Sequence, residues 1–164
     1  MADKSAASKD LLATALRLLS RRPRSVAELR EKLLAKGFDR DATEKAVEVL
    51  KKAGHLDDEK FAALLAGSRT KNKNWGPSKI IFDLNQKGIS PELIRKSVVR
   101  DPEAEAATAL AAFNRWVRKT GAFRPLDRKG AEKAYRFLKG RGFSSDVIFK
   151  VINRSKSGFE PDSE

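Results

Sequence analysis

One short phrase occurs three times in this chain, and it constrains the fold more than any other feature of the sequence. Residues 33–38, 84–89 and 138–143 each read as leucine, two variable residues, a lysine or arginine, glycine and a large apolar residue. The three glycines, Gly37, Gly88 and Gly142, follow one another at intervals of 51 and 54 residues. Repetition at nearly constant spacing is typical of helical repeat proteins, in which each unit packs only against its neighbours.

Each copy of the phrase predicts the end of a helix. The basic side chain stabilises the carbonyl end, glycine takes the left-handed conformation, and the apolar residue packs back onto the last turn. Upstream, Ser25 and Glu28 form a capping box, and Pro77 suits the first turn of a helix. The phrase therefore ends a middle helix in each repeat. Its apolar face is formed in the three copies by Val26, Leu29, Leu33 and Leu34, by Ile80, Ile81 and Leu84, and by Ala131, Ala134 and Leu138.

A further helix is predicted on each side of every middle helix. The helices that follow begin near Asp41, at Ser90 and at Ser144 or Ser145, and those that precede cover residues 11–19, 57–65 and 101–117. Because alternating β-branched runs are few, the sequence predicts an all-α fold of three tandem three-helix repeats, about nine helices, in an elongated and curved array. The predicted limits are 1–9 for a flexible N-terminus, 10–55, 56–100 and 101–153 for the repeats, and 154–164 for a flexible C-terminal tail.

Composition argues against catalysis. The chain has no cysteine and one histidine, His55, so disulfides, thiol chemistry and histidine-pair metal sites are excluded. We interpret residues 57–59, which are all acidic, as a helix start and not as a metal site. No activated nucleophile or acid–base pair is recognisable, so we expect no enzyme activity and no metal. No apolar run is long enough to cross a bilayer and the start has no apolar leader core, so we expect a cytoplasmic protein without membrane contact.

Charge points to a polyanionic partner. Lysine and arginine number 35 against 22 acidic residues, which gives a net charge of +13. Such an excess favours nucleic acid or an acidic protein surface as partner, although it can also serve solubility alone. Residues 67–79 contain four cations, one tryptophan and no acid, and they are predicted to form a loop; residues 114–130 form a second basic stretch. The candidate partner- or DNA-binding residues are Arg69, Lys71, Lys73, Trp75, Lys79, Arg115, Arg118, Lys119, Arg124 and Arg128.

Two interpretations stay open for these residues. Trp75 either stacks on a base or fills a partner's pocket, or it anchors its own segment to the core; the second is favoured because a lone loop tryptophan usually buries its ring. For the cations of residues 67–79, binding is favoured over simple solvation. Phe113 and Trp116, three residues apart, are interpreted as core packing. The smaller cluster of Arg21, Arg22 and Arg24 fits binding and a polar turn equally well.

The second repeat carries a resemblance to a known family. Asp57 and Asp58 before Phe61, followed by residues 68–69 and by residues 76–80 leading into the second glycine phrase, resemble the RecX family of bacterial RecA regulators. The resemblance covers roughly residues 10–153. It implies a cytoplasmic protein of nine helices without cofactor or small-molecule substrate, with roles in DNA repair, homologous recombination and the SOS response. A monomer is the default expectation, and the oligomeric state stays open.

The resemblance also implies a mode of action. The protein would bind in the groove of the RecA filament on single-stranded DNA and inhibit the recombinase, ATPase and coprotease activities of RecA. Lys79 stands where the family more often has arginine, and an ammonium group loses the two-point contact that a guanidinium makes. The alternative is a nucleic-acid-binding protein that acts without RecA and without sequence preference. Direct DNA binding would then weaken steeply with salt.

Overall fold

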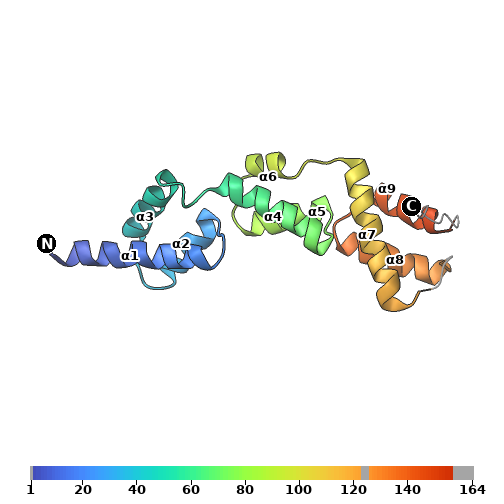
Figure 1. The fold of residues 1–164 in the computed structure, drawn as a ribbon, viewed down its shortest axis with the longest axis horizontal. Helices are drawn as coiled ribbons and strands as arrows, with labels where there is room; N and C mark the ends of the chain where they lie inside the picture. Colours follow the sequence, from blue (N-terminus) through green and yellow to red (C-terminus); the bar gives the residue numbers. More distant parts are fainter. Residues whose placement is uncertain (1, 123–125, 157–164) are drawn as a thin grey trace, which may run out of the picture. The chain divides into compact units, whose positions relative to one another are not determined.

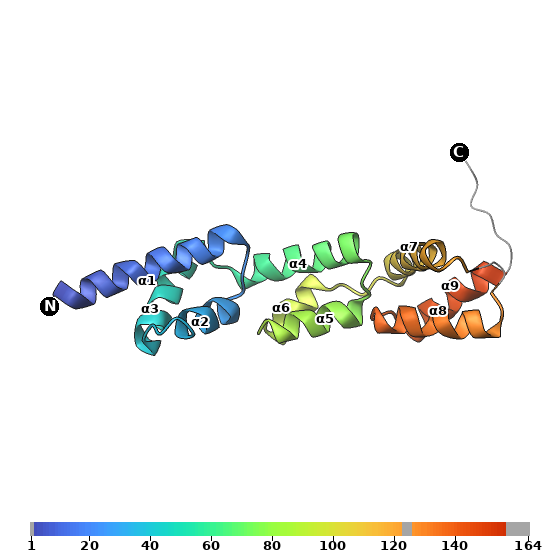
Figure 2. The same cartoon turned by 90° about the horizontal axis from the view of Figure 1, so that it is seen from below.

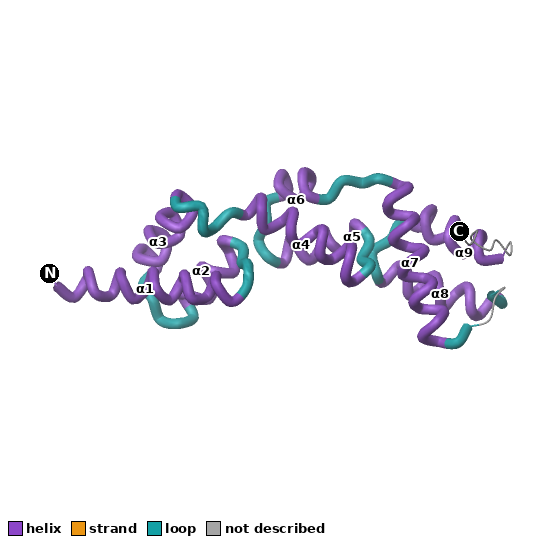
Figure 3. Tube along the Cα trace, in the orientation of Figure 1, coloured by secondary structure: helices purple, strands orange, loops and turns teal. Residues whose placement is uncertain are grey.

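The computed structural model describes residues 2–122 and 126–156, and every regular element in these residues is an α-helix (Figures 1 and 3). The described part of the chain contains nine helices in three consecutive sets of three, which confirms the predicted fold class. They are α1 (Ala2–Arg21), α2 (Val26–Leu34), α3 (Arg40–Lys52), α4 (Asp58–Lys73), α5 (Pro77–Gln86), α6 (Pro91–Ser97), α7 (Pro102–Thr120), α8 (Arg128–Gly140) and α9 (Ser145–Lys156).

The helices belong to two compact units. The first contains residues up to Leu64 together with Leu84–Ser97, and the second contains Leu65–Asp83 together with the chain from Val98 onward. The middle set, α4 to α6, therefore contributes to both units. The repeat limits derived from the sequence and the curvature of the array stay predictions.

Each unit has its own apolar core. In the first unit α1 lies along α2 and α3 (Figures 1 and 2), and buried leucines such as Leu29 and Leu33 fill the space between them. In the second unit α7, α8 and α9 pack together around Phe113, Leu138 and Phe143, all of which are 2% exposed or less. Of the apolar positions that the sequence assigns to the middle helices, Leu29, Leu33, Ile80, Leu84, Ala134 and Leu138 are buried, and the other four are half-buried.

Helix starts follow the predicted capping chemistry, with one correction. The Ser25 hydroxyl accepts a hydrogen bond from the Glu28 backbone N–H at 3.1 Å, and the Glu28 carboxylate accepts one from the Ser25 N–H at 3.3 Å. The prediction that α3 begins at Asp41 was wrong. The helix is capped by Asp39, whose carboxylate accepts from the Ala42 N–H at 3.0 Å. Asp39 is extended in backbone conformation, as a capping residue requires, whereas Asp41 is already helical.

The sequence misplaced two helix limits. Residues 67–73, predicted to lie in a loop, continue α4, and only residues 74–76 connect it to α5. The basic residues Lys71 and Lys73 fall in the last turn of α4, where positive charge stabilises the carbonyl end of a helix. Likewise α1 extends from Ala2 to Arg21, whereas the sequence predicted a helix over residues 11–19.

The glycine phrase ends α2, α5 and α8 as predicted. Gly37, Gly88 and Gly142 have φ angles of +86°, +71° and +87°. The apolar residue after each glycine donates its N–H back to the leucine that opens the phrase, with N···O distances of 3.3, 3.2 and 3.4 Å for the three copies. This bond satisfies a carbonyl that the helix end would otherwise leave without a partner.

The second and third copies of the phrase have an additional role, because each packs on the start of the preceding middle helix. In the first unit, the Ser25 hydroxyl at the start of α2 donates to the Lys87 carbonyl at 2.6 Å. In the second unit, the Gly76 N–H before α5 donates to the Arg141 carbonyl at 2.8 Å, and the Ser78 N–H donates to the Gly142 carbonyl at 3.1 Å. The helix stop is therefore also the contact that joins consecutive sets of helices.

Glu28 lies at the contact in the first unit. Its carboxylate is 3.1 Å from the Arg22 guanidinium and 3.0 Å from the Lys87 ammonium, and its side chain is 17% exposed. Burial by itself opposes ionisation of Glu28. The hydrogen bonds from Arg22 and Lys87 and from the Ser25 N–H outweigh that effect and lower the pKa to about 2. The ionised form of Glu28 therefore stabilises the fold.

We expect Glu28→Gln to lower the free energy of unfolding by about 2–3 kcal/mol at neutral pH. A carboxyl whose pKa is depressed by folding stabilises above its unfolded pKa and loses that contribution as the pH falls through its folded value. The difference between wild type and variant should therefore shrink between about pH 4.5 and about pH 2. Urea denaturation followed by far-UV circular dichroism over this range measures it. A difference that does not change with pH would show that the charge of Glu28 is not what stabilises the contact.

Candidate functional site

A hollow of about 600 Å³ in the second unit brings together cations that are distant in the sequence. We call it the basic pocket, and it lies among the end of α4, α7 and the last turns of α8. Four of the ten candidate residues line it, namely Lys73, Trp75, Arg115 and Lys119. None of its described lining residues is acidic. The full lining is Asn72, Lys73, Trp75, Arg115, Trp116, Lys119, Thr120, Phe137 and Arg141.

Trp75 forms one wall of the basic pocket and is held by two other candidate residues. The Arg69 guanidinium carbon and the Lys79 ammonium nitrogen each lie 4.9 Å from the centre of its ring system. Trp75 is half-buried, so the favoured interpretation as an anchor agrees with its surroundings. Two cations over one indole ring contribute roughly 1 kcal/mol each.

Arg69 and Lys79 are themselves engaged within the second unit. Arg69 Nε donates to the Asp83 carboxylate at 2.7 Å, and both side chains are largely buried. Lys79 Nζ donates to the Gly140 carbonyl at 3.0 Å, at the end of α8. Lys79 therefore stabilises the contact between α5 and α8 through a single hydrogen bond, which needs one ammonium group and not a two-point guanidinium contact.

Arg141 is the one cation lining the basic pocket that the sequence did not select as a candidate. It was identified only as the basic residue of the third helix stop. Its guanidinium donates to the Lys73 carbonyl and lies 4.6 Å from the centre of the Phe137 ring. The sequence does carry a signal, because the third copy of the phrase has arginine where the first two have Lys36 and Lys87.

The electrostatic environment of Arg141 is unusual. Burial lowers the pKa of its guanidinium, and the positive charge of Arg115 lowers that pKa further. Its Nε is buried and has no hydrogen-bond partner among the described residues. A buried N–H without a partner costs about 1–3 kcal/mol, so such a group is expected to have an acceptor when the site is in use.

Two residues that line the basic pocket, Trp116 and Phe137, belong to an aromatic stack. The ring of Trp116 stacks with those of Phe113 and Phe137, with centroid distances of 6.1 and 6.0 Å. Phe113 is fully buried. The interpretation of Phe113 and Trp116 as core packing is thus confirmed, and Trp116 fixes the position of the α7 cations relative to α8.

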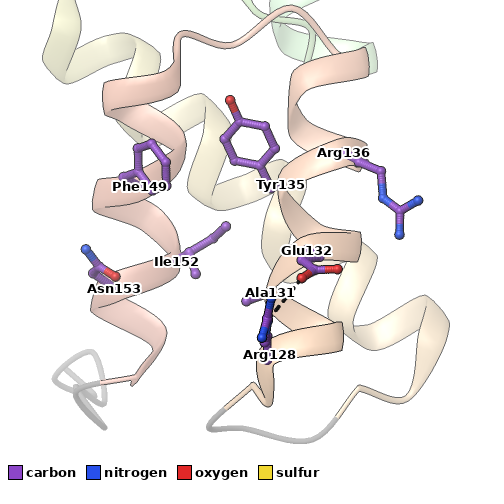
Figure 4. Close-up of a pocket in the computed structure, with 8 residues that line it drawn as sticks. All are labelled: Arg128, Ala131, Glu132, Tyr135, Arg136, Phe149, Ile152 and Asn153. Carbon is purple, nitrogen blue, oxygen red and sulfur yellow. Dashed lines mark hydrogen bonds and ion pairs between the residues drawn. The ribbon is translucent and has the colours of Figure 1, made fainter.

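The remaining candidate residues lie elsewhere or outside the described residues. Lys71 on α4 and Arg118 on α7 are exposed and do not line the basic pocket. Arg128 lies at the opposite end of α8, where its Nε is 3.4 Å from the Glu132 carboxylate (Figure 4). Arg124 is not among the residues that the structure describes. The sequence therefore grouped residues that the fold separates.

Arg128 borders a second hollow, of about 710 Å³, which differs in chemistry from the basic pocket. Figure 4 shows Tyr135 on α8 and Phe149 and Ile152 on α9 facing one another across it. Arg136 and Glu132 lie at its edge, so this hollow is apolar with mixed charge around it. It lacks the uniform positive charge that distinguishes the basic pocket.

In the small arginine cluster of the first unit, Arg22 and Arg24 both contact residues of their own unit. Arg22 pairs with Glu28, and Arg24 Nε donates to the Leu18 carbonyl at 3.2 Å, near the carbonyl end of α1. Of the two equal interpretations of this cluster, these contacts favour the polar turn.

The acidic residues before α4 act as helix caps and contacts. The Asp57 carboxylate accepts from the Lys60 N–H at 3.0 Å, and that of Asp58 accepts from the Val26 N–H at 2.8 Å. Within the described ranges, no three histidine, cysteine or acidic residues are grouped so that they could hold a metal ion. None of the helices in those ranges combines the length and apolarity that crossing a bilayer demands.

Comparison with known proteins gives matches along most of the chain. Three family models match in order, described as the first, second and third three-helix domains of RecX, at residues 12–50, 57–97 and 103–152. The regulatory protein RecX of Chlorobium limicola is 36% identical over 155 residues, covering 94% of this chain and 93% of the relative. That of Halorhodospira halophila is 34% identical over 148 residues, covering 90% and 89%.

Solved structures show the same fold. A crystal structure of RecX from Lactobacillus salivarius superimposes with a TM-score of 0.79 at 18% identity, over 93% of this chain and 99% of that one. A second crystal structure, of a regulatory protein RecX, gives a TM-score of 0.81 at 22% identity, over 92% of this chain and 75% of the other. These identities are too low to carry more than the fold.

Proposed function

Because this chain belongs to the RecX family of regulatory proteins, we propose that it modulates the RecA recombinase as an inhibitor. In this proposal it binds in the groove of the filament that RecA forms on single-stranded DNA. It thereby suppresses the recombinase, ATPase and coprotease activities. The observation that carries the proposal is that the family models match all three sets of helices in order.

The proposed mechanism is binding without chemistry. A helical array that contacts neighbouring RecA subunits bridges them and competes with DNA or substrate for the same groove. Weak contacts spread over three sets of helices add through effective concentration, so no single contact has to be strong. The net charge of +13 raises the rate of encounter with a DNA-containing filament.

Hydrolysis of ATP by RecA in the presence of single-stranded DNA tests this function. We expect hydrolysis and strand exchange to fall as the protein approaches one copy per RecA subunit. A basic protein of similar net charge and unrelated fold is the control, because it competes for DNA without recognising the filament. Unchanged hydrolysis and strand exchange at that ratio would contradict the proposal.

The basic pocket supports a second candidate function, direct binding of nucleic acid without RecA. Its four cations, Lys73, Arg115, Lys119 and Arg141, lie around one hollow without an acidic residue in the lining. This function predicts binding of single-stranded DNA by the protein alone, with an affinity that falls steeply as salt is raised. Inhibition of RecA at a salt concentration at which the protein alone no longer binds DNA would favour filament recognition.

A further inference from the structure

We propose that the basic pocket is a phosphate-binding site, and that its ligand is a backbone phosphate of single-stranded nucleic acid. The inference rests on the proposed function and assigns a ligand to one part of the surface involved. The positive charge of the basic pocket comes from three separate elements, namely the end of α4, the last turns of α7 and the end of α8. The four cations are Lys73, Arg115, Lys119 and Arg141.

The first argument is the imbalance of charge. Two cations of the second unit that lie outside the basic pocket have acidic partners: Arg69 pairs with Asp83, and Arg128 with Glu132. Among the described residues neither Arg115 nor Arg141 forms an ion pair, and burial together with the nearby positive charge of Arg115 lowers the pKa of the Arg141 guanidinium. Like charges held around one hollow repel one another, and an anion between them removes that repulsion.

The second argument is the supply of donors. The guanidinium groups of Arg115 and Arg141 offer several N–H donors in a planar arrangement that matches phosphate oxygens. Arg141 also keeps a buried Nε without a partner among the described residues. The ammonium groups of Lys73 and Lys119 are exposed at the rim, where they can contact a neighbouring phosphate. A volume of about 600 Å³ accommodates a phosphate together with its sugar.

The third argument concerns the bases. A stacking platform needs a free aromatic face, but Trp116 stacks with both Phe113 and Phe137, and Trp75 has Arg69 and Lys79 over its ring. Protein side chains therefore already contact both indole rings, and we assign the ligand contact to the backbone phosphate and not to a base. Contact with the backbone alone carries no sequence information, so binding should not depend on base sequence.

The chain provides its own probe for this site. Its two tryptophans, Trp75 and Trp116, both line the basic pocket, so the fluorescence of the unlabelled full-length protein reports on it. Three ligands are titrated without RecA: an oligothymidylate lacking terminal phosphates, inorganic pyrophosphate, and polyglutamate at equal charge concentration. We expect a saturable change with oligothymidylate, a weaker one with pyrophosphate, competition between these two, and no saturable change with polyglutamate.

Each other outcome has a definite meaning. A response to pyrophosphate but not to oligothymidylate would overturn the polynucleotide assignment and leave a site for free phosphate compounds. An equal response to polyglutamate would overturn the phosphate assignment in favour of an acidic protein surface. No response to any of the three would overturn the site itself. Because RecA is absent, inhibition of RecA without a fluorescence response separates failure of this inference from failure of the proposed function.

Matched substitutions locate the binding. Arg115→Glu and Lys119→Glu, at exposed positions of α7, should each weaken binding of oligothymidylate by about tenfold or more. Arg136→Glu and Lys133→Glu make the same charge changes at exposed positions of α8 away from the basic pocket. Each of them should change the affinity for oligothymidylate by about twofold or less. Circular dichroism checks that all four variants keep their helices. Equal losses in both pairs would show general charge attraction and overturn the site.

Discussion

Replacing Gly142 by alanine is expected to lower the free energy of unfolding of the second unit by about 3–5 kcal/mol, against about 1 kcal/mol for the same change at Gly37. The two glycines end equivalent helices with φ angles of +87° and +86°. The strain of a left-handed alanine is therefore the same at both positions, about 1–2 kcal/mol, and a less flexible unfolded chain partly offsets it. Any larger effect at Gly142 comes from its surroundings.

Those surroundings differ because Gly142, unlike Gly37, lies against a preceding set of helices. A Cβ atom at position 142 would be 2.3 Å from the Lys79 backbone nitrogen and 2.6 Å from the Lys79 Cβ, whereas at Gly37 nothing lies within 4 Å. Backbone atoms cannot rotate out of the way, so α8 and α5 must separate. The hydrogen bonds from the Gly76 and Ser78 N–H groups, each contributing about 1 kcal/mol, would be strained or lost.

Urea denaturation followed by tryptophan fluorescence measures the change at Gly142, since Trp75 and Trp116 both belong to the second unit. Far-UV circular dichroism measures the control, Gly37→Ala, in the first unit. Similar losses at the two positions would mean that glycine is required only for its φ angle. The close approach to α5 would then contribute nothing measurable to stability.

Reversing three charges of the basic pocket is expected to abolish inhibition of RecA. The variant Lys73→Glu/Arg115→Glu/Lys119→Glu changes exposed side chains, so the fold should tolerate it. It converts a site with four cations into one with three carboxylates and Arg141. The loss of three contacts to a polyanion, each contributing about 1–3 kcal/mol, should raise the concentration needed for half-inhibition by well over tenfold.

The control carries the same charge change elsewhere in the second unit. Lys133→Glu/Arg136→Glu/Lys150→Glu alters two lysines and one arginine, all exposed and none lining the basic pocket. Both variants are compared by the DNA-dependent ATP hydrolysis of RecA, with circular dichroism to verify helical content. If the control loses as much inhibition, net charge and not the pocket is responsible. Full inhibition by the pocket variant would exclude the pocket from the RecA-directed surface.

Arg69 is left out of this variant for a structural reason. The sequence placed Arg69 with Lys71 and Lys73 in one cationic loop, but Arg69 pairs with Asp83 at 2.7 Å and covers the Trp75 ring. Reversing its charge would place two carboxylates together and disturb the fold. Lost inhibition in such a variant would then report on stability and not on binding.

The sequence by itself determined the helical fold and the way each middle helix ends. Capping residues such as Ser25 and glycines such as Gly37, Gly88 and Gly142 act on their own helix over a few residues, so their effect can be read from local order. The same locality explains the error at α3. Asp39 and Asp41 both resemble caps, and only the path of the turn after Gly37 selects the first of them.

Only the tertiary structure decided which cations share a surface and which hold the fold together. Lys73 and Arg141 are distant in the sequence and meet because α8 ends against the start of α5. Lys79 takes part in the same contact, whereas Arg128 lies at the far end of α8. The sequence shows that a residue is charged but not where its side chain points. The role of a cation depends on the acid, carbonyl or aromatic ring that packing places beside it. Arg69 and Lys79 found such partners, whereas Arg115 and Lys119 were left facing the basic pocket.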